Sequence, residues 1–422
     1  MTTTTQGRLV LLGINHNTAP IEVRERLAIP AERLADATLT LLHQPGIREG
    51  LILSTCNRVE LLTLQDDAEA TLPQTKIDLL RFLHEYFAVS PHDIQPHLYE
   101  FREREAVRHL FRVASSLDSM VVGEPQILGQ VKEAYTIARD AGAVSTHLEA
   151  LLQRTFTVAK KIRTETQIGS SSVSIASVAV DLATKIFGSL YGKTVLLVGA
   201  GKMSELAARH LIQKGASSIL VTNRTQSRAE KIAENFSSLT VHTEAISFET
   251  LYEQADRADI VITSTGAPQK IFGRSHGQHF LHRRRNRPMF FIDIAVPRDV
   301  DPRMNEVEGC FVYDIDDLQQ VAAANLADRS REAAAAENIV SREVDKYQER
   351  LQSRDAVPAI KALQQQAEQL RLTELARSQS KLADLTPQQR QAVEALTRSL
   401  TAKLLHPQLT ALRESTRAKD PE

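Results

Sequence analysis

"KTVLLVGAGKMSELAARHLIQKG", residues 193–215, places an apolar run, a glycine-containing turn and an amphipathic segment in that order. An apolar run without alternation is typical of a strand buried on both faces of a parallel sheet, and a helix follows the turn directly. This order predicts the first βαβ unit of a doubly wound, dinucleotide-binding sheet. The later runs "SILVTN", "DIVITSTG" and "MFFIDIAVP" continue the pattern to about Val312. We therefore expect a Rossmann-type domain over residues 167–312.

The turn of this unit carries two of the three glycines of the dinucleotide fingerprint, with Ser204 at the third position. Gly199 permits a tight turn, and Gly201 lets a pyrophosphate approach the helix N-terminus. After the next predicted strand, "VTNRTQSR" offers no acidic residue to a ribose 2′-hydroxyl, whereas its cation and hydroxyl suit a 2′-phosphate. We expect NADPH rather than NADH, with two alternatives open: a domain without cofactor, and a surface salt bridge for the arginine. The expected cofactor-binding residues are Gly199, Ala200, Gly201, Lys202, Met203, Ser204, Asn223, Arg224 and Thr225.

Upstream, from Arg8 to about Phe101, four apolar runs alternate with two amphipathic runs in the order strand, helix, strand, strand, helix, strand. This order predicts a split β-α-β arrangement of the ferredoxin-like α+β kind. Residues 104–166 read mostly as helix, interrupted by "SLDSMVVGEPQILGQ" (116–130), a polar segment that suits the wall of a site. We expect residues 1–166 to form one substrate-binding, catalytic domain.

Downstream, the chain contains no glycine after Gly309, and residues 313–357 are rich in helix formers with apolar or alanine positions at helical spacing. The pattern predicts one spinal helix of about 40 residues, roughly 60 Å long, which Pro358 ends or kinks. Thr386 and Pro387 open a further helix with an aliphatic face. We expect residues 358–422 to form an all-helical dimerisation domain; an intrachain hairpin is the alternative.

Composition limits the classes of partner. The 422 residues include 51 basic and 52 acidic side chains, so no broad positive field attracts DNA, and any contact with RNA must be local. No run of 18 apolar residues and no signal-peptide pattern appears, which indicates a cytoplasmic protein without a membrane contact. The two cysteines lie far apart in sequence and form neither a disulfide framework nor a metal-binding spacing, so we expect no metal.

One of these cysteines, Cys56, stands at the junction of two predicted strands in "LSTCNRVEL". An isolated cysteine is usually an inert apolar residue, but the neighbours here are too polar for a core position. A thiolate favoured by Arg58 or by neighbouring amides could form a thioester, whose carbonyl accepts a hydride more readily than an ester and then releases an aldehyde. A nicotinamide cofactor and this cysteine together indicate reduction of a carboxylic acid derivative.

The blocks "GINHNTAP", "LSTCNRVEL", "SSLDSMVVGEPQILGQVKEAY", "RTETQIGSSSVS", "LLVGAGKM", "TNRT" and "IDIAVPRDVDP" together resemble the glutamyl-tRNA reductase family. The resemblance implies a V-shaped homodimer built from a catalytic domain, an NADPH domain and a dimerisation domain on a spinal helix. It implies reduction of glutamyl-tRNA(Glu) by NADPH to glutamate-1-semialdehyde through a cysteine thioester, the first step of five-carbon tetrapyrrole (porphyrin) biosynthesis. Transfer of the aldehyde to an aminomutase is a further expectation.

The same resemblance assigns residues to roles. Cys56 becomes the nucleophile, and His109 matches a histidine tied to activity, although a histidine on a helix is often structural. Arg58 is suited to grip the side-chain carboxylate of the glutamyl group, and Glu124 its α-ammonium; helix capping and turn formation are the alternatives for the 116–130 block. The expected substrate-binding residues are Thr55, Asn57, Arg58, Ser119, Glu124, Pro125, Gln126 and Gln130.

Two other functions stay open at this point. An NADP-dependent semialdehyde dehydrogenase would use the same cysteine thioester with a substrate other than tRNA. A regulatory module that senses NADPH and dimerises through its tail would not need Cys56 at all. A requirement for tRNA would distinguish a glutamyl-tRNA reductase from the semialdehyde dehydrogenase. Acyl transfer to the cysteine would exclude the regulatory module.

Overall fold

The computed structural model describes residues 7–66, 72–120, 123–124, 126–166, 168, 174–238, 241–323, 330–380, 382 and 385–417. The chain divides into two compact units, Met1–Val340 and Ser341–Glu422. Among the described residues, no helix combines the length and the apolar character needed to cross a membrane.

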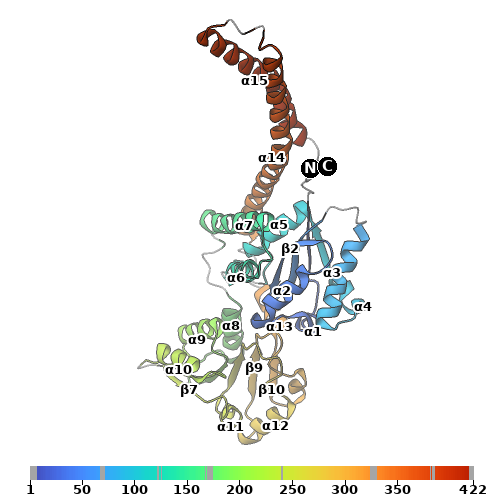
Figure 1. Ribbon diagram of the computed structural model, residues 1–422. Coiled ribbons are helices and arrows are strands. Elements are labelled where there is room, and N and C mark those ends of the chain that lie inside the picture. The colour runs from blue at the N-terminus through green and yellow to red at the C-terminus, as the bar shows by residue number, and fades with distance from the viewer. Residues whose placement is uncertain are drawn as a thin grey trace. The chain divides into compact units, whose positions relative to one another are not determined.

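The first part of the larger unit is a four-stranded antiparallel sheet in the order β2-β3-β1-β4 (Figure 1). This is the strand order of the ferredoxin-like arrangement, so the predicted fold is confirmed. Its strands are β1 (Arg8–Asn15), β2 (Ile47–Ser54), β3 (Arg58–Gln65) and β4 (Tyr99–Arg102). Its first helices are α1 (Ile21–Leu27), α2 (Leu34–Leu42), α3 (Leu72–Phe87) and α4 (Pro91–Ile94).

Successive side chains of β1 point to opposite faces of the sheet, and both faces are covered. Val10, Leu12 and Ile14 pack in one apolar cluster with residues of α2 and α3. The central strand β3 is buried along its whole length, because three further helices also pack in this part of the chain. These are α5 (Glu103–Ala114), α6 (Gln126–Asp140) and α7 (Thr146–Glu165).

A tight turn joins β2 to β3 and carries the cysteine. The Thr55 amide donates to the Arg58 carbonyl oxygen at 2.9 Å, which closes the turn around Cys56 and Asn57. Two buried antiparallel strands therefore fix both ends of the turn, and Cys56 lies at the edge of a rigid sheet.

The second part of this unit is a six-stranded sheet in the order β10-β9-β8-β5-β6-β7, in which all neighbouring strands are parallel. This order confirms the predicted doubly wound, Rossmann-type sheet. Its strands are β5 (Thr194–Val198), β6 (Ser218–Thr222), β7 (His242–Ala245), β8 (Ile260–Thr263), β9 (Met289–Asp293) and β10 (Cys310–Tyr313). Its helices are α8 (Ile175–Phe187), α9 (Lys202–Gln213), α10 (Gln226–Phe236), α11 (Leu251–Gln254) and α12 (Arg274–Arg283).

The C-terminal part is helical, with α13 (Ile315–Ala323), α14 (Ser330–Arg377) and α15 (Pro387–Arg417). The sequence predicts that Pro358 ends or kinks the long helix; an end at Pro358 is wrong, because α14 continues through that residue to Arg377. A proline inside a helix removes one amide donor, and a helix of 48 residues keeps enough other bonds to continue. Thr386 caps α15 as expected, since its hydroxyl accepts from the Gln389 amide at 3.3 Å.

Candidate active site

A narrow cavity of about 40 Å³ lies at the cysteine turn. It gathers nearly all of the substrate-binding residues that the sequence predicts, although they come from the β2–β3 turn and from the 116–130 block. The lining residues are Thr55, Cys56, Asn57, Arg58, Ser119, Glu124, Gln126, Ile127, Gln130, Ile175, Met203 and Ile294. Of the predicted set, only Pro125 lies outside the described residues.

Four apolar wall residues were not predicted as substrate-binding residues, and one of them is Ile127 of α6. Ile175 begins α8, Met203 belongs to the fingerprint turn, and Ile294 follows β9. Met203 was expected only as a cofactor contact, and nothing in the local sequence of Ile175 and Ile294 separates them from ordinary core residues. Cys56 itself packs against the apolar core of the parallel sheet. The cavity is therefore formed jointly by the antiparallel and the parallel parts of the unit.

Hydrogen bonds fix the cysteine turn from both sides. The Thr55 hydroxyl accepts from the amides of Asn57 and Arg58, each at 3.2 Å. From outside the turn, Arg24 Nη1 donates to the Cys56 carbonyl oxygen at 2.8 Å. The backbone of Cys56 is thus held while its side chain stays partly exposed to the cavity.

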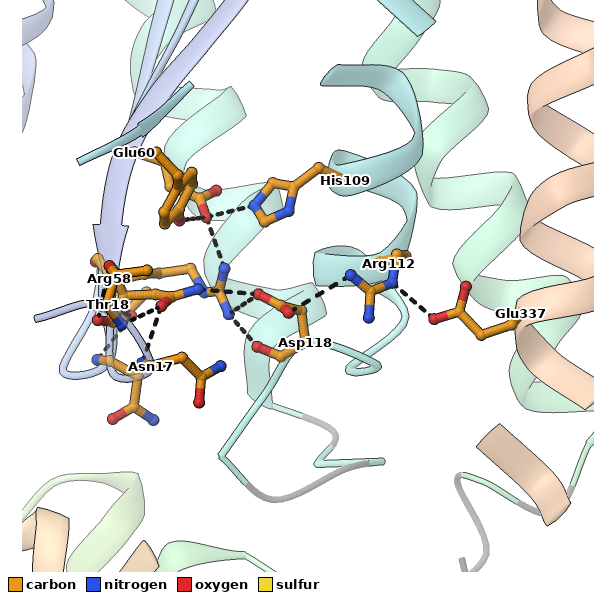
Figure 2. A network of polar contacts seen from close by, with 12 residues as sticks. Asn17, Thr18, Arg58, Glu60, His109, Arg112, Asp118 and Glu337 are labelled. Atoms are coloured by element: carbon orange, nitrogen blue, oxygen red, sulfur yellow. Dashed lines mark hydrogen bonds and ion pairs between the residues drawn. The ribbon is translucent and has the colours of Figure 1, made fainter. Parts of the chain in front are cut away.

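Arg58 lowers the pKa of the Cys56 thiol, as expected, but this effect is too small for the site to favour a thiolate. Burial, and after it the charge of Glu124, raises the pKa of the Cys56 thiol to about 12, and the lowering effects of Arg24 and Arg58 do not outweigh this. Arg58 contributes little because its own charge is already paired. Its Nη1 lies 2.6 Å from Glu60 Oε1, and its Nη2 lies 3.0 Å from Asp118 Oδ2 (Figure 2).

Glu60 is the centre of this buried network. Its Oε1 accepts hydrogen bonds from Arg58 Nη1 and from the Tyr99 hydroxyl at 2.5 Å, and it also lies 2.8 Å from His109 Nε2. Burial alone would raise the pKa of Glu60, but the charges of His109 and Arg58 together with these hydrogen bonds hold it well below its usual range. On the other side, Asp118 connects Arg58 to Arg112, which reaches Glu337 of α14 at 2.7 Å (Figure 2).

His109 does not line the cavity. Its ring is buried, bonded to Glu60 and stacked on Phe101 with ring centroids 4.6 Å apart. This geometry places His109 behind Arg58, where it supports the turn through Glu60. A direct catalytic role for His109 remains a prediction, and the contacts favour a positioning role.

Glu124 faces the cavity with a carboxyl oxygen for which the described part of the chain offers no partner. The residue is 8% exposed, and its Oε1 is buried without a hydrogen bond to any described residue. Burial raises the pKa of this carboxyl to about 7, despite a stabilising bond from the Ile175 amide. Gly123 places it there, since with φ of +90° an added Cβ would lie 2.0 Å from the Ile168 carbonyl oxygen. A buried acceptor of this kind suits a cationic group of a ligand.

The fingerprint turn has the geometry that a dinucleotide requires. Gly199 has φ of +106°, and a Cβ on Gly201 would meet no atom within 4 Å, so the backbone at the start of α9 is open to a phosphate. Ser204 is buried, and its hydroxyl lies 2.8 Å from that of Ser264, so the residue that replaces glycine is accommodated.

The predicted 2′-phosphate residues follow β6 at the edge where α9 begins. Asn223 Nδ2 donates to the Thr225 carbonyl oxygen at 3.0 Å, which shapes the loop. Arg224 is exposed, and no ion pair is found for it among the described residues. The residues expected to hold the cofactor, Ala200 and Lys202 included, thus lie on the carboxyl edge of β5 and β6.

Comparison with known proteins assigns each part of the chain. Residues 12–166 match the model of the glutamyl-tRNAGlu reductase N-terminal domain, 181–321 that of shikimate/quinate 5-dehydrogenase, and 335–422 that of the glutamyl-tRNAGlu reductase dimerisation domain. "Glutamyl-tRNA reductase 2" of Koribacter versatilis is 56% identical over 412 residues, which cover 98% of this chain and 91% of the relative. The chain belongs to the glutamyl-tRNA reductase family.

Other members of the glutamyl-tRNA reductase family are also similar over nearly the whole chain. The glutamyl-tRNA reductase of Solibacter usitatus is 47% identical over 406 residues, 96% of this chain and 94% of the relative. The solved glutamyl-tRNA reductase from Methanopyrus kandleri is 31% identical and covers 98% of this chain and 99% of its own, with a TM-score of 0.45.

Family membership confirms the resemblance read from the motifs and makes the protein an oxidoreductase. The dehydrogenase model includes the fingerprint turn and supports a nicotinamide cofactor. The model matched by residues 335–422 supports a homodimer.

Proposed function

We propose that the protein reduces glutamyl-tRNA(Glu) with NADPH to glutamate-1-semialdehyde through a thioester on Cys56, the first step of tetrapyrrole biosynthesis. The observation that carries the proposal is the composition of one cavity. It brings the only partly exposed cysteine among the described residues, the unpaired Glu124 carboxyl and Met203 of the fingerprint turn to one place.

In the first step the Cys56 sulfur bonds to the acyl carbon of the aminoacyl ester. The ester C–O bond breaks, and the terminal ribose hydroxyl of the tRNA leaves with the proton that the thiol has lost. A bound NADPH would supply the hydride that reduces the thioester to an aldehyde; the Cys56 sulfur would leave as a thiolate and take up a proton from solvent. Gly199 and Gly201 would hold the pyrophosphate, and Arg224 with Thr225 the 2′-phosphate.

Glu124 is the proposed partner of the substrate α-ammonium. Its carboxyl, with a pKa raised to about 7, lacks the counter-charge that would stabilise its ionised form. An ammonium brought by the substrate supplies that charge and lowers the pKa of Glu124 and of the Cys56 thiol together. The nucleophile would then ionise when substrate is present and stay protonated in its absence.

The remaining polar residues of the cavity are proposed to bind the glutamyl group. Thr55 and Asn57 belong to the turn, while Ser119, Gln126 and Gln130 form the opposite wall. Gripping of the side-chain carboxylate by Arg58 stays a proposal, because the network with Glu60 and Asp118 already takes both terminal nitrogens. A volume of about 40 Å³ is small beside the roughly 300 Å³ or more of ordinary ligand pockets. The cavity is therefore proposed to widen when a glutamyl group enters.

Acid-quenched labelling tests the proposal. The full-length protein is mixed with radiolabelled glutamyl-tRNA without NADPH, and wild type is compared with Cys56→Ser and with Cys310→Ser as matched control. We expect label on wild type and on Cys310→Ser, none on Cys56→Ser, and conversion of the label to aldehyde when NADPH is added.

Other outcomes identify the alternatives. Label from small glutamyl esters but none from glutamyl-tRNA would favour a semialdehyde dehydrogenase with a different substrate. No label from either donor, with NADPH binding retained, would favour the regulatory module and overturn the enzyme mechanism.

Further parts of the proposal concern the setting of the enzyme. We assign residues 1–166 to catalysis, 167–312 to NADPH, 313–357 to the spinal helix and 358–422 to dimerisation. Exposed leucines 396, 400 and 404 of α15 suit an apolar contact between two copies. A cytoplasmic location and direct transfer of the aldehyde to an aminomutase complete the proposal.

A further inference from the structure

Arg24 of α1 is a buried cation for which the sequence suggests no role. It is 1% exposed, and each of its three nitrogens donates to a different segment of the chain. Nε donates to the Ala19 carbonyl oxygen at 3.1 Å, Nη1 to the Cys56 carbonyl oxygen at 2.8 Å, and Nη2 to the carboxylate of Asp316. One guanidinium therefore ties the start of α1, the cysteine turn and the start of α13 together.

Three charged groups, Glu124, Arg24 and Arg58, act on the sulfur and differ in how far their charge is compensated. Glu124 is an acid without a counter-charge among the described residues. His16, whose backbone amide donates to the Asn57 carbonyl oxygen of the turn, is neutral because burial lowers its pKa to about 4. Arg58 is neutralised by two buried carboxylates, Glu60 and Asp118.

Arg24 has one carboxylate partner, Asp316, whose side chain is 32% exposed and so partly hydrated. The charge of Arg24 therefore lowers the pKa of the Cys56 thiol more than the charge of Arg58 does.

The helix that carries Arg24 is also held from the parallel-sheet part of the unit. Arg298, in the loop after β9, reaches Glu22 at 2.9 Å and Glu25 at 3.0 Å, both on α1. Asp316 belongs to α13, which follows β10 of the same sheet. The position of Arg24 at the cysteine turn thus depends on contacts with the part that binds the cofactor.

We propose that Arg24 is the positioning residue of the nucleophile, holding the cysteine turn by the Cys56 carbonyl and supplying positive charge to the sulfur, and that Asp316 sets how much of this charge the sulfur receives. Asp316 and Arg24 thereby connect the cofactor-binding part of the chain to the reactivity of Cys56. The inference rests on the proposed role of Cys56 as nucleophile, but its test requires neither tRNA nor NADPH.

The test is the rate at which iodoacetamide alkylates Cys56 in the full-length protein, followed by mass spectrometry of the peptide that contains it. At about pH 9, Glu124 is ionised in every variant. Loss of a nearby cation raises a thiol pKa by about one unit, so Arg24→Gln should react about tenfold more slowly than wild type. Asp316→Asn leaves Arg24 uncompensated and should react several-fold faster.

An effect of charge changes the alkylation rate in opposite directions in Arg24→Gln and Asp316→Asn, whereas a loosened turn changes it in the same direction in both. A turn that merely loses its support would expose the sulfur and speed alkylation in both variants, and that result would overturn the proposal, as would rates unchanged in both. Arg24→Lys keeps the charge with fewer donors, so we expect a rate near wild type. Arg26→Gln, on the same helix with a 44% exposed side chain paired to Asp93, is the matched control and should not change the rate.

Labelling by glutamyl-tRNA separates this inference from the proposed function. Arg24→Gln should acquire thioester more slowly in proportion to its loss of thiolate. If wild type takes no label while the alkylation rates follow the predicted signs, the substrate assignment fails and the role of Arg24 stands.

Discussion

Replacing Glu124 with glutamine should change the reactivity of Cys56 only where Glu124 is ionised. With a pKa of about 7, this carboxyl is roughly one-tenth ionised at pH 6 and almost fully ionised at pH 9. The negative charge of Glu124 raises the pKa of the buried Cys56 thiol. A neighbouring like charge typically raises a pKa by about one unit or more, which reduces the thiolate population roughly tenfold. Glutamine keeps the shape of the side chain and removes the charge.

The expected quantity is the ratio of alkylation rates, Glu124→Gln over wild type, as a function of pH. The ratio should be close to one at pH 6, about twofold at pH 7, pass its midpoint near pH 8 and approach about tenfold at pH 9. The two alkylation rates are measured by mass spectrometry, as the extent of iodoacetamide labelling of Cys56 in the Cys310→Ser background. A ratio that is constant across this range would refute the reasoning, because a steric effect of the substitution does not titrate.

Three further substitutions test the network and the cofactor site. Glu60→Gln leaves Arg58 and His109 without their shared carboxylate and should lower the free energy of unfolding by about 3 to 5 kcal/mol, measured as a lower melting temperature. Folding lowers the pKa of Glu60, so this stability difference should be present above about pH 4.5 and shrink as the pH falls below that value. Glu337→Gln removes a partner that is 30% exposed and should change stability by less than about 1 kcal/mol, and a larger loss would show that Arg112 depends on it. Arg224→Gln should raise the KM for NADPH about tenfold or more and leave that for NADH unchanged; equal effects on both would rule out a 2′-phosphate contact.

The fold could be predicted because its signals are local. The unbroken apolar run that includes Val10 and Leu12 marks a strand covered on two faces, and the glycine with φ of +106° marks the turn into α9. The residues of the cavity could be collected because the cysteine turn and the 116–130 block are polar where a core would be apolar. The wall residues Ile175 and Ile294 carry no such signal, since an isoleucine in a cavity wall and one in the core look alike in sequence.

Electrostatics could not be predicted in the same way. Proximity in sequence suggested that Arg58 activates Cys56, but the direction of its side chain is set by Glu60 and Asp118, of which Asp118 lies 60 residues away. Arg24 lies 32 residues from the cysteine and meets it only through tertiary packing. The helix propensity of proline alone indicates a break at Pro358. That α14 continues past this residue depends on the hydrogen bonds of the rest of the helix.

Met203 belongs both to the dinucleotide turn and to the wall of the cavity that holds Cys56. Under the proposed function, a shift at the start of α9 on pyrophosphate binding would also reshape the cavity for the acyl group. By thermodynamic reciprocity, the factor by which cofactor changes the affinity for the acyl donor would equal the factor by which the donor changes the affinity for the cofactor. Met203 would then couple the two binding equilibria.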